Sequence, residues 1–144
     1  MQVDFNARYA SYLKNLSIEG LNAMQIAVLQ KISIVNDLMV LSPTGSGKTL
    51  PFLLACVSGF KSEVRAVQAI VVTPSRELAL QIEQVFKAMK TSFKVSCCYG
   101  GHSFKTEQDS LSEAPALLIA TPGPISDHIS SPIIRLFSRS TGCA

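Results

Sequence analysis

The chain begins with two segments in which apolar side chains recur three, four or seven positions apart, the spacing of one face of an α-helix. In the first segment these residues are Phe5, Tyr9, Tyr12, Leu13 and Leu16, and in the second they are Leu21, Met24, Val28 and Ile32. Asn22 stands just before most of the second pattern, where its side chain would cap a helix. We therefore expect two helices within residues 1–35.

From about residue 37 onward, short apolar runs alternate with longer helical patterns. The runs, each expected to form a strand, lie at about residues 37–42, 69–72, 93–99 and 116–120. The expected helices end near residue 60, carry a buried stripe between Leu78 and Met89, open at Ser103, and span about 122–129. Strands separated by helices of this length join through right-handed crossovers into a parallel sheet with helices on both faces. The pattern predicts an α/β fold.

Composition and charge agree with a single globular domain. Of 144 residues, 47% are hydrophobic and 16% charged, which excludes a disordered chain, and the net charge of +3 decides nothing about partners. The four cysteines form no C-x-x-C pair, and two histidines do not complete a zinc site. No apolar stretch reaches the length of a membrane span, so we expect a cytoplasmic protein without a membrane partner and with reduced thiols.

The stretch LSPTGSGKTL, residues 41–50, joins the first expected strand to the helix after it. At such a junction the first N–H groups of the helix are unpaired and the helix dipole favours negative charge, so a polyphosphate fits there. Gly45 and Gly47 let the backbone approach closely, Lys48 reaches the outer phosphates, and the Thr49 hydroxyl is placed for Mg2+. The stretch predicts a nucleotide-binding loop.

Two features of this loop depart from the usual pattern. The strict form G-x-x-x-x-G-K-[ST] needs glycine at position 42, and this chain has Ser42. Pro51 is expected to remove a hydrogen bond from the following helix. A glycine-rich turn without function is the alternative interpretation, but strand, spacing and helix together favour nucleotide binding.

With its first glycine replaced, the loop resembles motif I of the DEAD-box RNA helicases, usually A-x-T-G-S-G-K-T. Four other stretches resemble motifs of the same family, in the family's order: LNAMQ, ending at Gln25, resembles the Q motif, PSRELALQ at 74–81 motif Ia, YGG at 99–101 the GG motif, and ATPGPISDHI at 120–129 motif Ib. The resemblance covers about residues 1–129. It implies a partial RecA-like domain of the P-loop NTPase class.

The resemblance implies binding of ATP with Mg2+. Gln25 would hydrogen-bond the adenine edge, although Leu21 and Asn22 replace the proline and threonine usual in this motif. Either Phe5 or Tyr9 would stack on the base, and neither stands at the family's usual spacing before Gln25. The triphosphate would be held by Thr44, Gly45, Ser46, Gly47, Lys48 and Thr49, with Thr49 as the Mg2+ ligand.

The other motifs would hold single-stranded or locally unwound RNA by its sugar-phosphate backbone. The residues implied are Pro74, Ser75, Arg76 and Glu77, then Gly100 and Gly101, then Thr121, Pro122 and Gly123. Each group follows an expected strand, where backbone N–H groups can meet phosphates without reading bases. For Arg76 an internal ion pair with a carboxylate is an equal alternative to a phosphate contact.

The carboxylate pair that would hold Mg2+ and orient water is not in this sequence, and neither is an arginine finger. The D-E-A-D and S-A-T motifs that would follow in the family are missing, and residues 130–144 resemble no family element. We expect three parts: a Q-motif helical region at 1–35, a partial RecA-like ATP-binding domain at 36–129, and an atypical tail. A designed cut, a gene fragment or a broken reading frame would each explain the tail.

The resemblance implies an ATP-dependent RNA helicase, a hydrolase acting on ATP, of which this chain alone would lack turnover. Two alternatives stay open: a helicase fragment that binds RNA or nucleotide without catalysis, and a small P-loop kinase. Without the S-A-T strand, the strand expected at 37–42 would have an open edge, so we expect poor folding of the isolated chain. Oligomeric state, target RNA and cellular process are not predicted.

Overall fold

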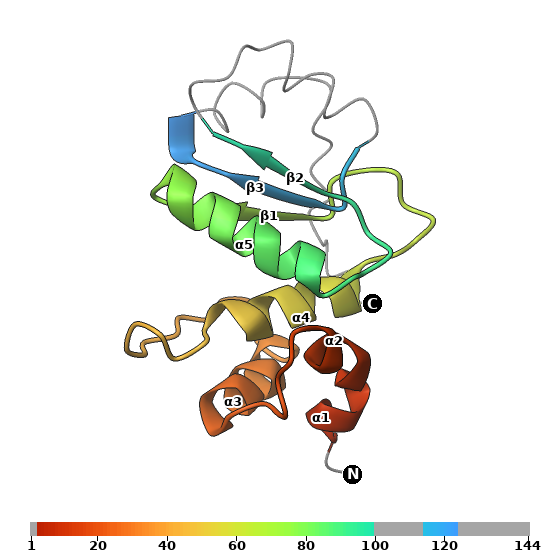
Figure 1. The fold of residues 1–144 in the computed structure, drawn as a ribbon, viewed down its shortest axis with the longest axis vertical. Coiled ribbons are helices and arrows are strands. Elements are labelled where there is room, and N and C mark those ends of the chain that lie inside the picture. Colours follow the sequence, from red (N-terminus) through yellow and green to blue (C-terminus); the bar gives the residue numbers. More distant parts are fainter. Residues whose placement is uncertain (1–2, 100–113, 124–144) are drawn as a thin grey trace. The chain divides into compact units, whose positions relative to one another are not determined.

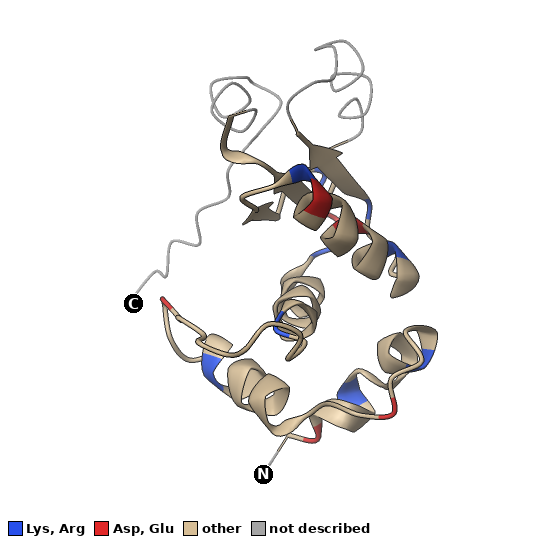
Figure 2. Cartoon of the chain, turned by 60° about the vertical axis from the view of Figure 1, so that its left-hand side comes forward, with Lys and Arg blue, Asp and Glu red and all other residues tan. Residues whose placement is uncertain are grey.

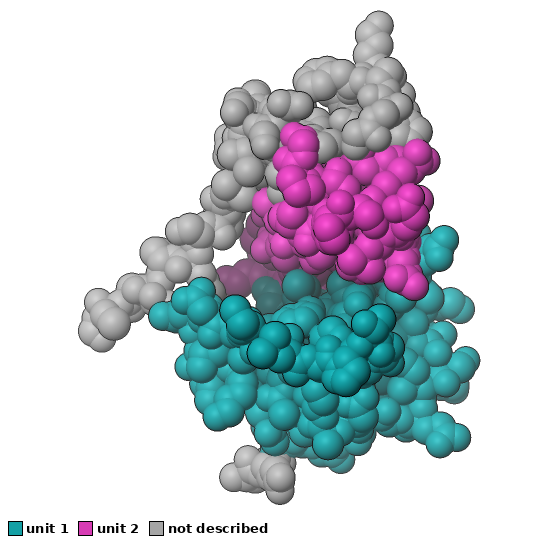
Figure 3. Space-filling model, turned by 90° about the vertical axis from the view of Figure 1, so that its left-hand side faces the viewer, with its two compact units in different colours: residues 1–59, 84–92 teal, residues 60–83, 93–144 magenta. Residues whose placement is uncertain are grey.

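The computed structural model describes residues 3–99 and 114–123. The chain divides into two compact units, residues 1–59 with 84–92 (unit 1) and residues 60–83 with 93–144 (unit 2; Figure 3). In chain order (Figure 1) the helices and strands are α1 (Phe5–Arg8), α2 (Ala10–Asn15), α3 (Ala23–Ile32), α4 (Thr49–Gly59), β1 (Ala69–Val72), α5 (Arg76–Ala88), β2 (Val95–Cys98) and β3 (Leu117–Ala120).

The helices expected within residues 1–35 are present in unit 1, the first of them split at Tyr9 into α1 and α2. The Asp4 carboxylate accepts hydrogen bonds from two N–H groups at the start of α1. The Asn22 side chain caps α3 as expected, accepting a hydrogen bond from the backbone N–H of Gln25 at 2.9 Å. The periodic apolar positions thus located the helical regions correctly. Leu13 is buried in α2, and Val28 and Leu29 are buried in α3, whereas α1 has no buried residue.

The helix after the glycine-rich loop, α4, is confirmed and carries no acidic or basic side chain in its first or last turn. Its buried residues are Leu50, Pro51, Leu53, Leu54 and Val57. The expectation that Pro51 costs a helix hydrogen bond was wrong. Because α4 begins at Thr49, Pro51 lies in the first turn, where N–H groups have no partner inside the helix.

The strand expected at residues 37–42 is absent: residues 37–43 are irregular backbone. Met39 is 83% exposed and Leu41 is 89% exposed, so this apolar run covers no core. An apolar run becomes a strand only when a neighbouring strand pairs with its backbone, and the described sheet consists of β1, β3 and β2. The run therefore has the apolar pattern of a buried strand, but no strand among the described residues pairs with it.

Unit 2 contains the expected parallel sheet, in the order β1-β3-β2 (Figure 1). Ala69 pairs with Leu117 and Val72 with Ala120, while Val95 and Cys98 pair with the same two residues from the other side. All four residues of β3 are 0% exposed, as expected for a central parallel strand. The three strands match the predicted runs closely, and the last of them in sequence lies in the middle of the sheet.

Several expectations fall on residues outside the described ranges. They are the helix opened by Ser103, the end of the helix at 122–129, and residues 130–144; Pro122 and Gly123, the last described residues, are helical. Among the described residues no helix combines the length and apolar character that crossing a membrane requires. Among the described cysteines, Cys56, Cys97 and Cys98 form no disulfide, and burial raises the pKa of Cys56.

Candidate functional site

The glycine-rich loop of unit 1 has the backbone conformation that its glycines allow. Gly45 has φ of 83° and Gly47 has φ of 79°, in the left-handed region that side chains with a Cβ avoid. The backbone N–H of Ser46 donates to the Pro43 carbonyl at 3.3 Å, which tightens the turn. The residues predicted to bind phosphate, Thr44 to Thr49, form this tight turn and end at the first residue of α4.

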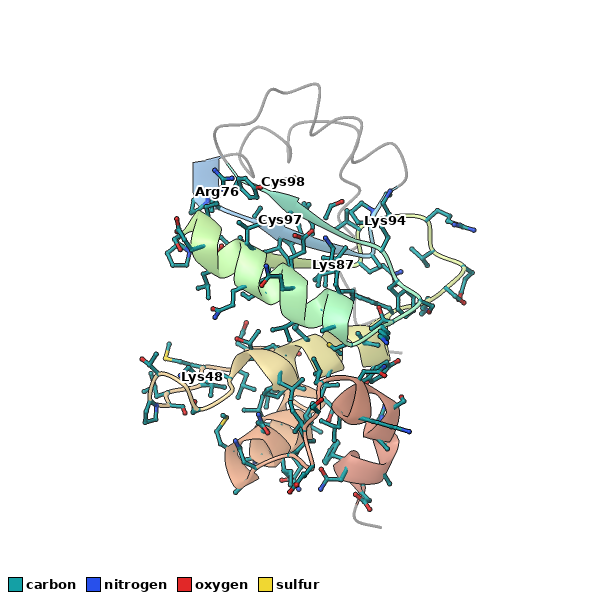
Figure 4. All side chains as sticks on the ribbon, viewed as in Figure 1. Lys48, Arg76, Lys87, Lys94, Cys97 and Cys98 are labelled. Carbon is teal, nitrogen blue, oxygen red and sulfur yellow. The ribbon has the colours of Figure 1, made fainter. Side chains whose placement is uncertain are left out.

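Lys48 bends back over this loop (Figure 4). Its amine donates to the carbonyls of Ser42 at 2.7 Å and Pro43 at 2.6 Å, and to the Ser46 hydroxyl at 3.3 Å. The lysine therefore has the reach that phosphate binding needs, but its donors are engaged by the loop itself. This engagement was not predicted, because nothing in a local motif shows where a flexible side chain lies without ligand.

Gln25 lies against the same loop and is only 6% exposed. Its Oε1 accepts from the backbone N–H of Asn22 at 2.9 Å, and its Nε2 donates to the Gly47 carbonyl at 3.1 Å. A Cβ built on Gly47 would lie 2.6 Å from that Nε2, so glycine is needed there for close approach as well as for its φ. The structure thus brings together two predicted ATP-binding residues that are far apart in sequence.

Asn22, predicted only as a helix cap and as a departure from the Q motif, also contacts the loop. Its Nδ2 donates to the Ser46 carbonyl at 3.2 Å, while its Oδ1 caps α3. With Gln25 it forms a capping box, in which each side chain bonds the other residue's backbone N–H. The spacing N-x-x-Q signals this box in the sequence, but the bond to Ser46 has no local signal.

Of the two aromatic residues that the sequence left as alternatives for stacking on a base, Tyr9 is committed to the core. It is 4% exposed, and its hydroxyl lies 2.7 Å from the Ser58 hydroxyl in α4. Phe5 is half-buried, and its ring lies nearly parallel to that of Tyr9, with 6.4 Å between the centroids. Phe5 is therefore the more accessible ring.

In unit 2 the predicted RNA-contacting residues lie at the carboxyl ends of the strands. Hydrogen bonds continue past the sheet, from the N–H of Thr73 to the Ala120 carbonyl at 2.9 Å and from the N–H of Thr121 to the Cys98 carbonyl at 3.1 Å. Because the strands are parallel, the residues after β1 and after β3 emerge at one edge. Gly100 and Gly101, which follow β2, lie outside the described residues.

Arg76, labelled in Figure 4, is the first residue of α5. It contacts Tyr99, which follows β2. The guanidinium carbon lies 4.4 Å from the ring centroid, a cation–π geometry. Arg76 thus has an internal contact with an aromatic ring, and its charge also acts on the neighbouring Glu77 carboxylate. It links motif Ia to the first residue of the YGG stretch.

The start of α5 already carries an anion. The Ser75 hydroxyl accepts from the N–H of Leu78 at 3.3 Å, and Arg76 and Glu77 follow side by side (Figure 2). The pKa of Glu77 is lowered by a hydrogen bond from its own backbone N–H, by one from Ser75, and by the charge of Arg76. Glu77 thus supplies a carboxylate to the helix terminus that would otherwise attract a phosphate. Within the described ranges, no three His, Cys, Asp or Glu side chains gather as a metal site.

Comparisons with known proteins agree with this architecture. The model of the DEAD/DEAH box helicase family matches residues 22–140. The chain is 36% identical to the ATP-dependent RNA helicase DBP8 of Gibberella zeae over 119 residues, which are 81% of this chain and 22% of that protein. It is 39% identical to the DEAD-box ATP-dependent RNA helicase RhpA of Helicobacter pylori over 103 residues, 70% of this chain and 21% of that protein. The chain thus spans about a fifth of the length of these curated relatives.

A solved structure supports the fold. The crystal structure of a hypothetical ATP-dependent RNA helicase from Sulfolobus tokodaii superposes with a TM-score of 0.74 and 23% sequence identity, over 90% of this chain and 38% of that one. The likeness confirms a partial RecA-like α/β fold with a parallel sheet. Since the family model also covers most of the chain, this chain belongs to the DEAD/DEAH box helicase family.

Proposed function

We propose that this chain is the ATP-binding and RNA-contacting part of an ATP-dependent RNA helicase, and that unit 1 holds the nucleotide. The observation that carries the proposal is the junction of Gln25 with the glycine-rich loop, because it joins an adenine-reading side chain to a phosphate cradle. A small P-loop kinase has no use for that junction, and the family match argues against it. A cytoplasmic location remains a prediction.

The residues of the loop fit a magnesium triphosphate. Two left-handed glycines, the start of α4 and one lysine supply a close backbone, the positive end of a helix dipole and a positive charge. Thr49, the first residue of α4, offers a hydroxyl oxygen, the hard donor that Mg2+ prefers. When bound, Mg2+ would neutralise charge on the phosphates, and Lys48 would move its amine from the Ser42 and Pro43 carbonyls to the outer phosphate.

For the base, we infer that Gln25 hydrogen-bonds the adenine edge and that Phe5 stacks on its face. Both polar ends of the Gln25 amide are already bonded, one to Asn22 and one to Gly47. Each end still has a second position for a hydrogen bond, because the amide oxygen has another lone pair and the NH2 group another hydrogen, so Gln25 can bind adenine while it supports the loop. Tyr9 keeps its place under α4 through Ser58.

RNA would be held at the strand ends of unit 2, by backbone contacts at Pro74 to Glu77 and Thr121 to Gly123. The shared edge and the Arg76–Tyr99 contact support this assignment. Because Glu77 already occupies the start of α5, a phosphate must compete with its carboxylate. Binding should accordingly be weak, indifferent to base sequence and sensitive to salt. We include Gly100 and Gly101 among the residues proposed to contact RNA on the basis of the YGG motif alone.

The test is a titration with fluorescent magnesium-ATP. Lys48→Ala should weaken binding at least about tenfold, because it removes the cation of the cradle. Lys31→Ala is the matched control, since Lys31 is an exposed lysine in the last turn of α3 and should leave the affinity unchanged. Equal affinity of the wild type and Lys48→Ala would contradict the phosphate cradle. RNA-stimulated hydrolysis by this chain should not exceed background, because its sequence has no D-E-A-D carboxylates.

A further inference from the structure

Ser42 holds the first position of the loop, where the strict pattern has glycine, and its side chain bridges to the other end. Its hydroxyl donates to the Ser46 hydroxyl at 2.6 Å, and both residues are partly buried. A glycine or an alanine at this position would have no group to make this bond. The bridge is therefore a property of this chain's own residue.

The same residue holds the lysine. The Ser42 carbonyl accepts from the Lys48 amine at 2.7 Å, and the Ser46 hydroxyl that receives the bridge also accepts from that amine at 3.3 Å. Ser42 thus fixes Lys48 twice, through its own carbonyl and through the hydroxyl that it positions. A phosphate that recruits the lysine must break the bonds to the Ser42 and Pro43 carbonyls.

We propose that Ser42 is a positioning residue that keeps the nucleotide loop closed in the free chain, with Lys48 withdrawn onto the loop carbonyls, and so lowers the affinity for magnesium-ATP. This inference rests on the proposed nucleotide site. Loss of the hydroxyl frees the Ser42 backbone to turn, the lysine loses its fixed acceptor, and less of the binding free energy goes into opening the loop.

Ser42→Ala should therefore strengthen magnesium-ATP binding by about threefold to tenfold, the factor that corresponds to about 0.7 to 1.4 kcal/mol for one hydrogen bond. In the nucleotide-free chain, the backbone amides of residues 44–48 should exchange with deuterium faster by a similar factor. Ser46→Ala breaks the bridge from its other end and should raise the exchange in the same way. Ser42→Thr keeps a hydroxyl and should restore both wild-type values.

Ser33→Ala is the matched control, because it removes an exposed serine hydroxyl of unit 1 that bonds the Gln30 carbonyl, away from the loop. It should change neither exchange at 44–48 nor affinity. Exchange in α3 and α4 reports whether each variant is folded, so a variant that unfolds is recognised and the comparison is made with the other.

Unchanged exchange at 44–48 in both folded variants would overturn the inference, as would faster exchange without tighter binding in Ser42→Ala. Suppose that the wild type binds magnesium-ATP, that Lys48→Ala loses this binding, and that Ser42→Ala binds with the same affinity as the wild type. The proposed function then stands and the role of Ser42 fails. If the loop opens in Ser42→Ala and no form binds magnesium-ATP, the proposed function itself fails, and so does the effect of Ser42 on nucleotide affinity.

Discussion

The glycine-rich loop of unit 1 and the strand ends of unit 2 both gather groups suited to phosphates, but different forces hold them. In the loop, side chains bond backbone carbonyls: Lys48, Gln25 and Asn22 each contact a carbonyl between positions 42 and 47. At the strand ends, the parallel register of β1, β3 and β2 sets the positions, and the Arg76–Tyr99 pair joins two of the motifs.

This difference teaches where substitutions should matter. A loop that depends on a few side-chain bonds and two special φ values loses much of its order when one residue changes. A site that depends on a sheet keeps its geometry when a surface side chain changes, because backbone pairing carries it. We therefore expect larger effects on stability in the loop than at the strand ends.

The largest expected effect is that of Gly47→Ala. The new Cβ forces a left-handed alanine, which costs about 1 to 2 kcal/mol, and it displaces the Gln25 amide from the Gly47 carbonyl, which adds about 0.5 to 1.5 kcal/mol. Gly45→Ala is the matched control, because it has a similar φ and nothing within 4 Å of the Cβ. Denaturant unfolding measures both. Equal losses for the two variants would show that the Gln25 contact contributes nothing.

Asn22→Ala should lower the free energy of unfolding by about 1 to 2 kcal/mol, because it removes the cap of α3 and the bond to Ser46 together. Asn22→Thr keeps an acceptor for the cap and loses the bond to the Ser46 carbonyl. Its loss should be about half as large, and the amides of residues 44–48 should exchange faster. If the amides of residues 44–48 exchange at the wild-type rate in Asn22→Thr, the Asn22 side chain does not stabilise the loop.

These two predictions concern features that the sequence shows only in part. The N-x-x-Q spacing and the glycines can be read locally, and so can the apolar runs that became β1, β2 and β3, because periodicity and turn chemistry act over a few residues. The contact of Gln25 with Gly47 joins residues 22 positions apart, so a linear motif cannot display it.

The strand predicted at residues 37–42 was wrong because a clear local pattern was present but a pairing partner among the described residues was not. Its apolar residues match a buried strand, but pairing depends on a second segment, and pattern alone does not supply one. Similarly, the sequence leaves a phosphate or a carboxylate as the partner of Arg76, and the contact with the Tyr99 ring has no local signal because it depends on β2. Domain bounds and ligand roles remain predictions, since neither the fold nor the family match tests them.

At the strand ends, the Arg76–Tyr99 pair should contribute about 0.5 to 1 kcal/mol, the value of a cation–π contact near the surface. A double-mutant cycle with Arg76→Gln and Tyr99→Leu measures it by denaturant unfolding. Arg65→Gln, at an exposed arginine of the same unit, combined with Tyr99→Leu should show no coupling. A coupling larger than the loss in Gly47→Ala would reverse the comparison between the two regions.

The smallest expected effect is the pH dependence from Glu77. Its pKa is lowered in the folded chain, so its stabilising contribution is complete above the ordinary pKa of 4.5 and is lost as the pH falls through the lower folded value. Glu77→Gln should therefore flatten the loss of stability in that acid window and change little at neutral pH. Asp37→Asn, in unit 1, serves as the control. An unchanged acid slope in Glu77→Gln would mean that its carboxylate is not held at the start of α5.

The exposure of Met39 also allows the folded state of this chain to be followed by methionine oxidation. Peroxide converts an accessible methionine thioether to a sulfoxide, whereas a buried thioether reacts only after the surrounding structure opens. Met39 is 83% exposed and Met89 is 0% exposed, and both lie in unit 1. Met39 should therefore gain oxygen in the folded chain and Met89 only on unfolding. The masses of the two peptides then report separately whether something covers the apolar segment around Met39 and whether unit 1 is folded.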